Sequence, residues 1–262
     1  AGSRGVLSVF GLHRTQWVGL DGAPTTNAFS INAPLGSNLG GGLSFVNDRI
    51  GPTVENTISA DLSYSIKTSE SYKLSFGIKG TANLFNLDIN KLKVQNQGDP
   101  LLQNLNNNFS PNVGAGVYFH SDKSYLGLSV PNFFESYRYN DNNMKITKEK
   151  MHFYFIAGHV FELSPSLKFK PALLTKMVEG APLQADVTAN FLLFDKLTLG
   201  AAYRWDAAVS ALAGFQISDS WFIGYGYDLE TTKLARYNSG SHEIFLRYEL
   251  FNRTRVTAPR FF

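Results

Sequence analysis

The side chains of this chain that could perform acid–base, nucleophilic or metal chemistry are five histidines and the run Ser241-His242-Glu243. His152 and His159 fall in one predicted strand, but no His-x-x-x-His spacing or carboxylate cluster provides a set of metal ligands. Ser241, His242 and Glu243 are consecutive, and consecutive strand residues point to opposite faces, so adjacency alone does not make a catalytic triad. The chain has no cysteine, which excludes disulfides, thiolate metal sites and cysteine nucleophiles. The sequence therefore predicts no enzyme, no cofactor and no metal site.

A second set of polar side chains is spaced to share one face of a sheet. Arg14 and Gln16 lie two residues apart, so in a strand they project from the same face, where they could pair with Asp61 or Asp228. The full predicted network comprises Arg14, Gln16, Asp61, Lys73, Lys79, Asp228 and Arg247. We predict a structural polar network in a wet interior, in preference to a transport site.

Strands must position these residues, because apolar and polar side chains alternate along most of the chain. Every odd position from Trp221 to Leu229 is apolar or aromatic, whereas Gly224, Gly226 and Asp228 occupy the opposite face. A soluble antiparallel sandwich shows the same period and is the alternative fold. The 14% aromatic content and the many polar residues on the second face favour a barrel with its apolar side toward lipid. The predicted strands are 5–17, 26–34, 40–49, 54–66, 72–86, 111–120, 125–133, 151–162, 167–177, 184–194, 197–205, 208–217, 221–230 and 242–251.

The composition agrees with a membrane-spanning sheet. No stretch approaches the roughly eighteen uninterrupted apolar residues of a membrane helix. Lipid offers no partners to backbone N–H and C=O groups, so a sheet crosses a membrane only as a closed barrel. The net charge of +3 is too small and dispersed to argue for nucleic acid. We therefore predict an all-β, transmembrane antiparallel β-barrel of about fourteen strands.

The connections predict the topology of this barrel. Turns of a few residues alternate with longer links, as in outer-membrane barrels with short periplasmic turns and longer extracellular loops. The predicted extracellular loops are 18–25, 87–110, 134–150, 178–183 and 231–241. Residues 1–251 are expected to form the barrel, and residues 252–262 a periplasmic tail. The opening Ala1-Gly2-Ser3-Arg4 is already strand-like, from which we expect a processed or truncated form.

Several short motifs, in this order, resemble the PorP/SprF family of outer-membrane proteins associated with type IX secretion and gliding. They are Arg14-Thr15-Gln16-Trp17, Gly22-Ala23-Pro24-Thr25-Thr26, Asn47-Asp48-Arg49-Ile50-Gly51, Asp99-Pro100, Pro111-Asn112-Val113-Gly114-Ala115-Gly116, Ser129-Val130-Pro131-Asn132, Gly224-Tyr225-Gly226-Tyr227-Asp228 and Gly240-Ser241-His242-Glu243-Ile244. The resemblance spans nearly the whole chain, and its specificity lies in the ordered set. The family's amino-terminal Asn-Pro-aromatic-Ala-Gly motif is represented only by Ala1-Gly2.

The resemblance implies an outer-membrane protein that binds and anchors a large secreted surface protein, such as an adhesin, through that protein's C-terminal domain. It also implies contact with outer-membrane lipid and with other type IX secretion components on the periplasmic side. A partner could bind the extracellular rim or insert a chain segment into the polar lumen. The residues that we expect to face the partner are Asn96, Asp99, Pro100, Asn106, Asn107, Tyr137, Tyr139 and Met144.

Two other functions remain open from the sequence. A barrel of this size has room for a passive channel for small or hydrophobic solutes, which could be lined by Lys73, Lys79, Lys168, Lys170 and Lys176. An outer-membrane hydrolase would need a convergent Ser/His pair, which the sequence does not supply.

Overall fold

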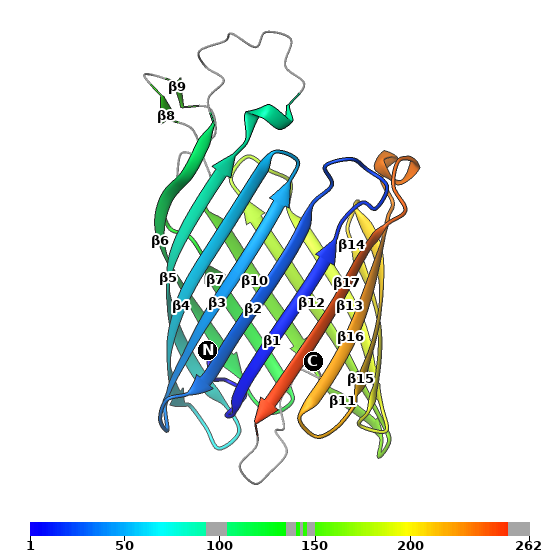
Figure 1. The fold of residues 1–262 in the computed structure, drawn as a ribbon. Coiled ribbons are helices and arrows are strands. Elements are labelled where there is room, and N and C mark those ends of the chain that lie inside the picture. The colour runs from blue at the N-terminus through cyan, green and yellow to red at the C-terminus, as the bar shows by residue number, and fades with distance from the viewer. Residues whose placement is uncertain (93–103, 135–139, 142–143, 146–149, 251–262) are drawn as a thin grey trace.

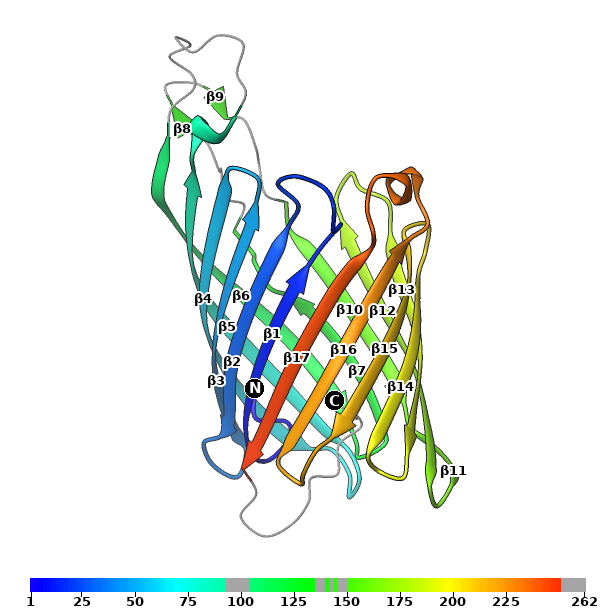
Figure 2. The same ribbon diagram turned by 45° about the vertical axis from the view of Figure 1, so that its right-hand side comes forward.

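The computed structural model describes residues 1–92, 104–134, 140–141, 144–145 and 150–250. Within these residues, fourteen tilted antiparallel strands close into a barrel (Figures 1 and 2). They are β1 (Leu7–Thr15), β2 (Thr25–Pro34), β3 (Leu39–Ile50), β4 (Thr53–Lys67), β5 (Lys73–Leu87), β6 (Leu105–His120), β7 (Ser124–Val130), β10 (His152–His159), β12 (Leu167–Val178), β13 (Gln184–Leu193), β14 (Leu197–Arg204), β15 (Ala208–Gln216), β16 (Trp221–Glu230) and β17 (Ser241–Leu250). The predicted fold class is confirmed.

Five short elements accompany the fourteen barrel strands in the described residues. The strands β8 (Asn140–Asp141) and β9 (Met144–Lys145) pair with each other outside the barrel sheet. The strand β11 (Phe161–Ser164) follows β10 and pairs with the lower part of β12. The 3₁₀ helices η1 (Ile89–Lys91) and η2 (Lys233–Arg236) lie in connections at the upper end (Figure 1). None of the helices in the described part of the chain is long and apolar enough to span a membrane.

The barrel closes where the first strand meets the last. β1 pairs with β17 from Leu7↔Leu250 to Thr15↔His242, and β10 pairs with β12 on the far side of the ring. Pairing on both sides along most of each strand satisfies its backbone groups without water, as a lipid environment requires. The closure brings residues near the start of the chain beside residues near its end.

The two faces of the wall have opposite chemistry. Along β4, Ile58 and Leu62 are about half exposed on the outer face, whereas Ser59 and Ser63 are buried on the inner face. Among the described residues only four apolar side chains are buried, against twelve polar or charged ones. This distribution is the reverse of a soluble core and matches an exterior that faces lipid. Because the sheet is closed and apolar outside, the soluble sandwich is excluded.

Most connections at the upper end are longer than those at the lower end (Figure 1). The first strand, β1, begins at the lower end, and the last strand, β17, ends there. The upper end is therefore extracellular.

The predicted loop 87–110 is too long, because β5 and β6 stay paired up to Leu87↔Leu105. Asn106 and Asn107, predicted to lie in that loop, are residues of β6. Their asparagine-rich sequence suggested a loop, but the ladder accommodates it through a local register shift with Asn107 in the left-handed region (φ 51°).

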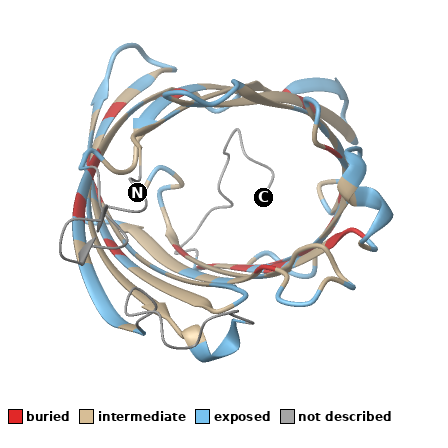
Figure 3. Cartoon of the chain, turned by 90° about the horizontal axis from the view of Figure 1, so that it is seen from above, coloured by how far each residue is buried: buried red, intermediate tan, exposed pale blue. Residues whose placement is uncertain are grey.

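The amino-terminal residues do not continue β1 as predicted but lie inside the barrel near its lower end (Figures 1 and 3). Ser63 Oγ on β4 donates a hydrogen bond to the carbonyl oxygen of Ala1 at 2.7 Å. Gly40 on β3 makes this close approach possible, because a Cβ atom there would lie 2.5 Å from the same oxygen. Residues 1–5 thus occupy lumen space. The predicted tail 252–262 lies outside the described residues.

Candidate functional site

An ion-pair cluster lies on the lumen side where β1, β16 and β17 run next to each other near the extracellular end. The Arg14 guanidinium on β1 contacts the Asp228 carboxylate on β16 at 2.5 Å and the Glu243 carboxylate on β17 at 3.3 Å. All three side chains are partly buried, with at most 26% of each exposed. Partial burial reduces screening by water, so this bridge is stronger than a fully exposed pair. It ties together the strands that close the barrel.

The loop after β1 is fixed to the same place by hydrogen bonds. Trp17 has a left-handed backbone (φ 48°), and its indole Nε1–H donates to Glu230 Oε1 at 2.8 Å. Its backbone N–H donates to the buried hydroxyl of Ser241 at 3.2 Å. The next residue, Val18, donates to the carbonyl of Gly240 at 2.9 Å and accepts from Ser239 at 2.7 Å. Three motifs that are far apart in the sequence, around residues 14–17, 224–228 and 240–244, therefore form one structural unit.

A second charged cluster lies on the same wall near the periplasmic end. Glu249 on β17 pairs with Arg4 of the amino-terminal segment and lies 3.2 Å from Arg247 Nε. The Arg247 guanidinium also covers the ring of Phe222 at 4.9 Å from its centroid. Alternation along β17 places Arg247 and Glu249 on one face, so that half of the cluster was visible in the sequence. Arg4 was missed because it precedes the strand and carries no periodic signal.

Between the two charged clusters, aromatic rings fill part of the lumen. Phe245 lies 6.0 Å from Phe10 and 6.1 Å from Phe222, measured between ring centroids. Gly214 and Gly224 leave the space into which the rings of Phe222 and Phe245 pack. The interior is therefore polar at two levels and aromatic between them, on the side formed by β1 and β15–β17.

The structure divides the predicted polar network. It brings Arg14 and Asp228 together, whereas Asp61 lies on β4, three strands from β1, directly opposite Lys79 on β5. Gln16 lies beyond the end of β1, in the fixed loop, and its backbone N–H donates to Pro24.

The lysines suggested for a channel are also dispersed. Lys73 is exposed at the lower end of β5, and Lys168 pairs with Asp195 at 2.7 Å. Lys170 is only 4% exposed, and Lys176 lies near the upper end of β12. These positions do not form one continuous cationic lining.

The strands β6 and β7 show why two more of the motifs occur together. The Asn112 side chain on β6 donates to the Phe134 carbonyl at 2.7 Å and accepts from the Phe134 N–H at 3.0 Å. A Cβ atom at Gly114 would collide with the Pro131 carbonyl. The run 111–116 thus holds the residues after β7 against β6, and β7 ends at Val130. Pro111 is tolerated because, by strand alternation from Val113, its nitrogen faces the side where the β7 ladder has ended.

Most of the predicted partner-facing residues belong to the two long insertions between β5 and β6 and between β7 and β10. Asn96, Asp99, Pro100, Tyr137 and Tyr139 lie outside the described residues, and Met144 is placed only as part of β9.

The described residues show no catalytic or metal-binding arrangement around the histidines. Ser241 contacts Trp17, His242 Nδ1 contacts the Tyr225 hydroxyl at 2.5 Å on the outer face, and Glu243 contacts Arg14, so the three side chains diverge. His159 Nδ1 lies 2.7 Å from the Ser124 hydroxyl, a pair without an acid beside it in the described residues. No group of three potential ligands among these residues could hold a metal ion.

Comparison with known proteins identifies the family. The family model described as "Type IX secretion system membrane protein PorP/SprF" matches residues 1–248. The chain belongs to the PorP/SprF family. The motifs that meet in this PorP/SprF barrel, around residues 14–17, 224–228 and 240–244, are among those on which the sequence resemblance rested.

Solved structures that are similar to this PorP/SprF protein are outer-membrane barrels of low sequence identity. They include the CymD monoaromatic hydrocarbon channel (TM-score 0.53, 10% identity, covering 95% of this chain and 89% of that chain). The Acinetobacter baumannii outer membrane protein Omp33 has a TM-score of 0.50 and 8% identity, covering 94% and 100%. The Ralstonia pickettii toluene transporter TbuX has a TM-score of 0.50 and 8% identity, covering 93% and 87%. These likenesses show the fold alone, and no curated protein matches the chain. Family and fold together locate the protein in the outer membrane.

Proposed function

We propose that this PorP/SprF barrel binds a large secreted surface protein, an adhesin, through that protein's C-terminal domain and anchors it at the outer membrane. Membership of a type IX secretion family supports a role with exported proteins. The observation that carries the proposal is the fixed part of the extracellular rim, which the loops after β1 and before β17 form. Hydrogen bonds from Trp17, Val18 and Ser239 join the loop after β1 to the loop before β17. A rim that is already ordered loses little conformational entropy when a protein binds.

The same rim presents side chains that suit a protein interface. Tyr237, directly after η2, is 69% exposed, and Lys233 and Arg236 within η2 add positive charge. Tyrosine and arginine are enriched among the residues that dominate binding energy. We expect a partner domain that offers an apolar pocket with acidic groups at its edge. The insertion residues Asn96, Tyr137 and Tyr139 remain predicted contacts.

The lumen supports anchoring more than passive transport. Residues 1–5 lie inside the barrel near its lower end, and Phe10, Phe222 and Phe245 fill part of the lumen between the two charged clusters. Both features narrow the path that a solute would take.

The first test is to purify the protein from native outer membranes in mild detergent and to identify bound proteins by mass spectrometry. We expect one large secreted protein in near-equal amount, retained through its C-terminal domain. Tyr237→Ala should reduce its recovery at least severalfold, whereas Phe194→Ala, an exposed aromatic residue at the periplasmic end, should not. Recovery of the barrel alone from cells that demonstrably express such proteins would refute anchoring.

Planar-bilayer conductance of the same preparation tests the alternative. Steady, large single-channel currents from the purified protein would favour a passive channel.

A further inference from the structure

We propose that the lumen holds a binding site for a short, uncharged oligosaccharide, which is a function in addition to protein anchoring. The site is a hollow of about 520 Å³ that is open to the rest of the lumen and lined by β2–β7, β10 and the amino-terminal segment. Its volume falls within the range of roughly 300–1,000 Å³ that is usual for small-molecule sites. It is large enough for a di- or trisaccharide.

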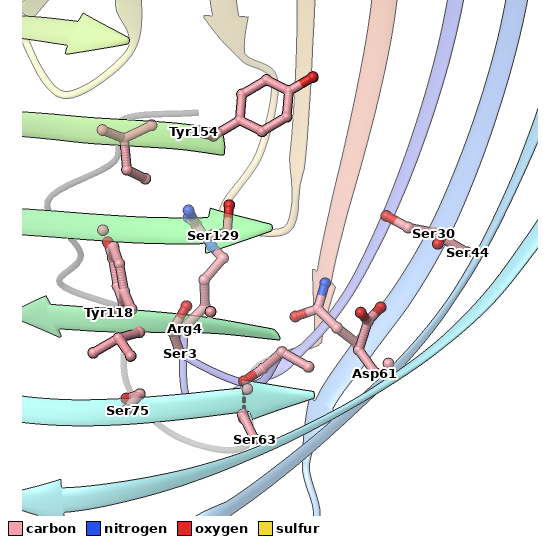
Figure 4. A pocket seen from close by; sticks show the side chains of 18 of the residues that line it. Ser3, Arg4, Ser30, Ser44, Asp61, Ser63, Ser75, Tyr118, Ser129 and Tyr154 are labelled. Carbon is pink, nitrogen blue, oxygen red and sulfur yellow. Dashed lines mark hydrogen bonds between the residues drawn. The ribbon is translucent and has the colours of Figure 1, made fainter. Parts of the chain in front are cut away.

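The hollow is lined by polar side chains whose hydrogen-bonding groups are not used by other residues that the structure describes. Ser30, Asn32, Ser44, Asp61, Ser129 and Tyr154 all line it. Within the described part of the chain, none of these six side chains has a hydrogen-bond or ion-pair partner. Figure 4 shows Ser129 and Tyr154 on one side of the hollow and Ser30, Ser44 and Asp61 on the other. Convergent polar groups of this kind fix the orientation of a bound ligand.

The hollow is lined by one cation and one anion, Arg4 and Asp61, so it has no strong excess of either charge and favours an uncharged ligand. Arg4, on its wall, is paired with Glu249. Asp61 lies opposite Lys79 in the β4–β5 register but forms no ion pair with it. The Asp61 carboxylate can therefore accept hydrogen bonds from ligand hydroxyls, which are strengthened by its charge. A ligand with a net charge would gain little from these balanced surroundings.

A sugar, which is rich in hydroxyl groups, fits this lining better than a peptide does. Serine and tyrosine hydroxyls both donate and accept, as sugar hydroxyls do. The strands around the hollow are paired on both sides in its lower part, so an incoming peptide finds no free backbone edge there to extend the sheet. The rings of Tyr118 and Tyr154 add apolar surface for the C–H face of a sugar ring.

Isothermal titration calorimetry of the purified, detergent-solubilised barrel tests this site without any protein partner. The probes are neutral trisaccharides of glucose, galactose and mannose, with an uncharged tripeptide and trilysine as competitors. At least one trisaccharide should bind in the millimolar range or tighter. Asp61→Asn should weaken it about tenfold, since one charge-assisted hydrogen bond is lost. Ser44→Leu should abolish it by filling the hollow.

The matched control is Asp219→Asn, in the exposed turn between β15 and β16, which should bind as the unaltered protein does. Faster migration of unheated samples in detergent gels checks that each variant is folded. The proposal is overturned if no trisaccharide binds, if Asp61→Asn and Ser44→Leu bind as tightly as the control, or if either peptide displaces the sugar and binds more tightly.

Discussion

At the scale of single residues, Arg14 has the central position. Among the described residues it is the one cation that contacts both Asp228 and Glu243, and its strand lies between theirs and β2 in the closed ring. The contact with Asp228 is shorter than that with Glu243, so we expect Asp228 to contribute more. A partly buried arginine that loses its carboxylate keeps the cost of desolvation without the compensating attraction.

Asp228→Asn should therefore lower the free energy of unfolding by about 1–3 kcal/mol, and Glu243→Gln by less. The measurement is urea unfolding of the detergent-solubilised barrel followed by tryptophan fluorescence. Glu162→Gln is the control, because its pair with Lys123 is more than half exposed and should be worth less than about 1 kcal/mol. Equal losses in all three variants would show that the cluster has no special role.

At the scale of elements, the short strand β7 depends on its neighbour β6. β7 has 7 residues against 16 in β6, and it ends where Asn112 binds both backbone groups of Phe134. Gly114 permits this crossing, because any side chain there would meet the Pro131 carbonyl. The end of β7 is thus determined by Asn112 and Gly114 of β6 together with Pro131, which directly follows β7 and has no backbone N–H to donate.

Gly114→Ala should accordingly destabilise the barrel by about 1–3 kcal/mol through overpacking against backbone that cannot move aside. Gly80→Ala on the adjacent β5 is the matched control, since no atom lies within 4 Å of a Cβ placed there. The temperature at which each variant loses its faster-migrating folded band in a detergent gel measures the stability of both variants. A stable Gly114→Ala variant would mean that residues 131–134 can leave β6 without loss.

At the scale of the whole molecule, the lumen is partly filled by side chains and by the amino-terminal segment. The amino-terminal segment is held by Ser63 and Glu249 at the periplasmic end, and the ion-pair cluster lies near the extracellular end. The anchoring and saccharide proposals use separate regions of the molecule, the rim and the lower lumen.

Removal of residues 1–5 should raise single-channel conductance severalfold, because it vacates space near the periplasmic end of the lumen. Gly40→Val provides a second route to the same result, since a side chain at Gly40 displaces Ala1. Gly80→Val on the outer face should leave conductance unchanged. Unaltered conductance in both lumen variants would contradict a narrowing role for this segment.

The sequence by itself determined the strands, their sidedness and the topology, because alternation and connection length are local properties of the chain. Ser59 and Ile58 reveal their faces through neighbours within a few residues. Only the tertiary structure decided which distant residues meet. Arg14 had two candidate acids, and barrel closure placed Asp228 within reach while leaving Asp61 three strands away. The inward path of Arg4 and the clamp of Asn112 on Phe134 were equally invisible, because each depends on a contact between segments that carry no periodic signal of it.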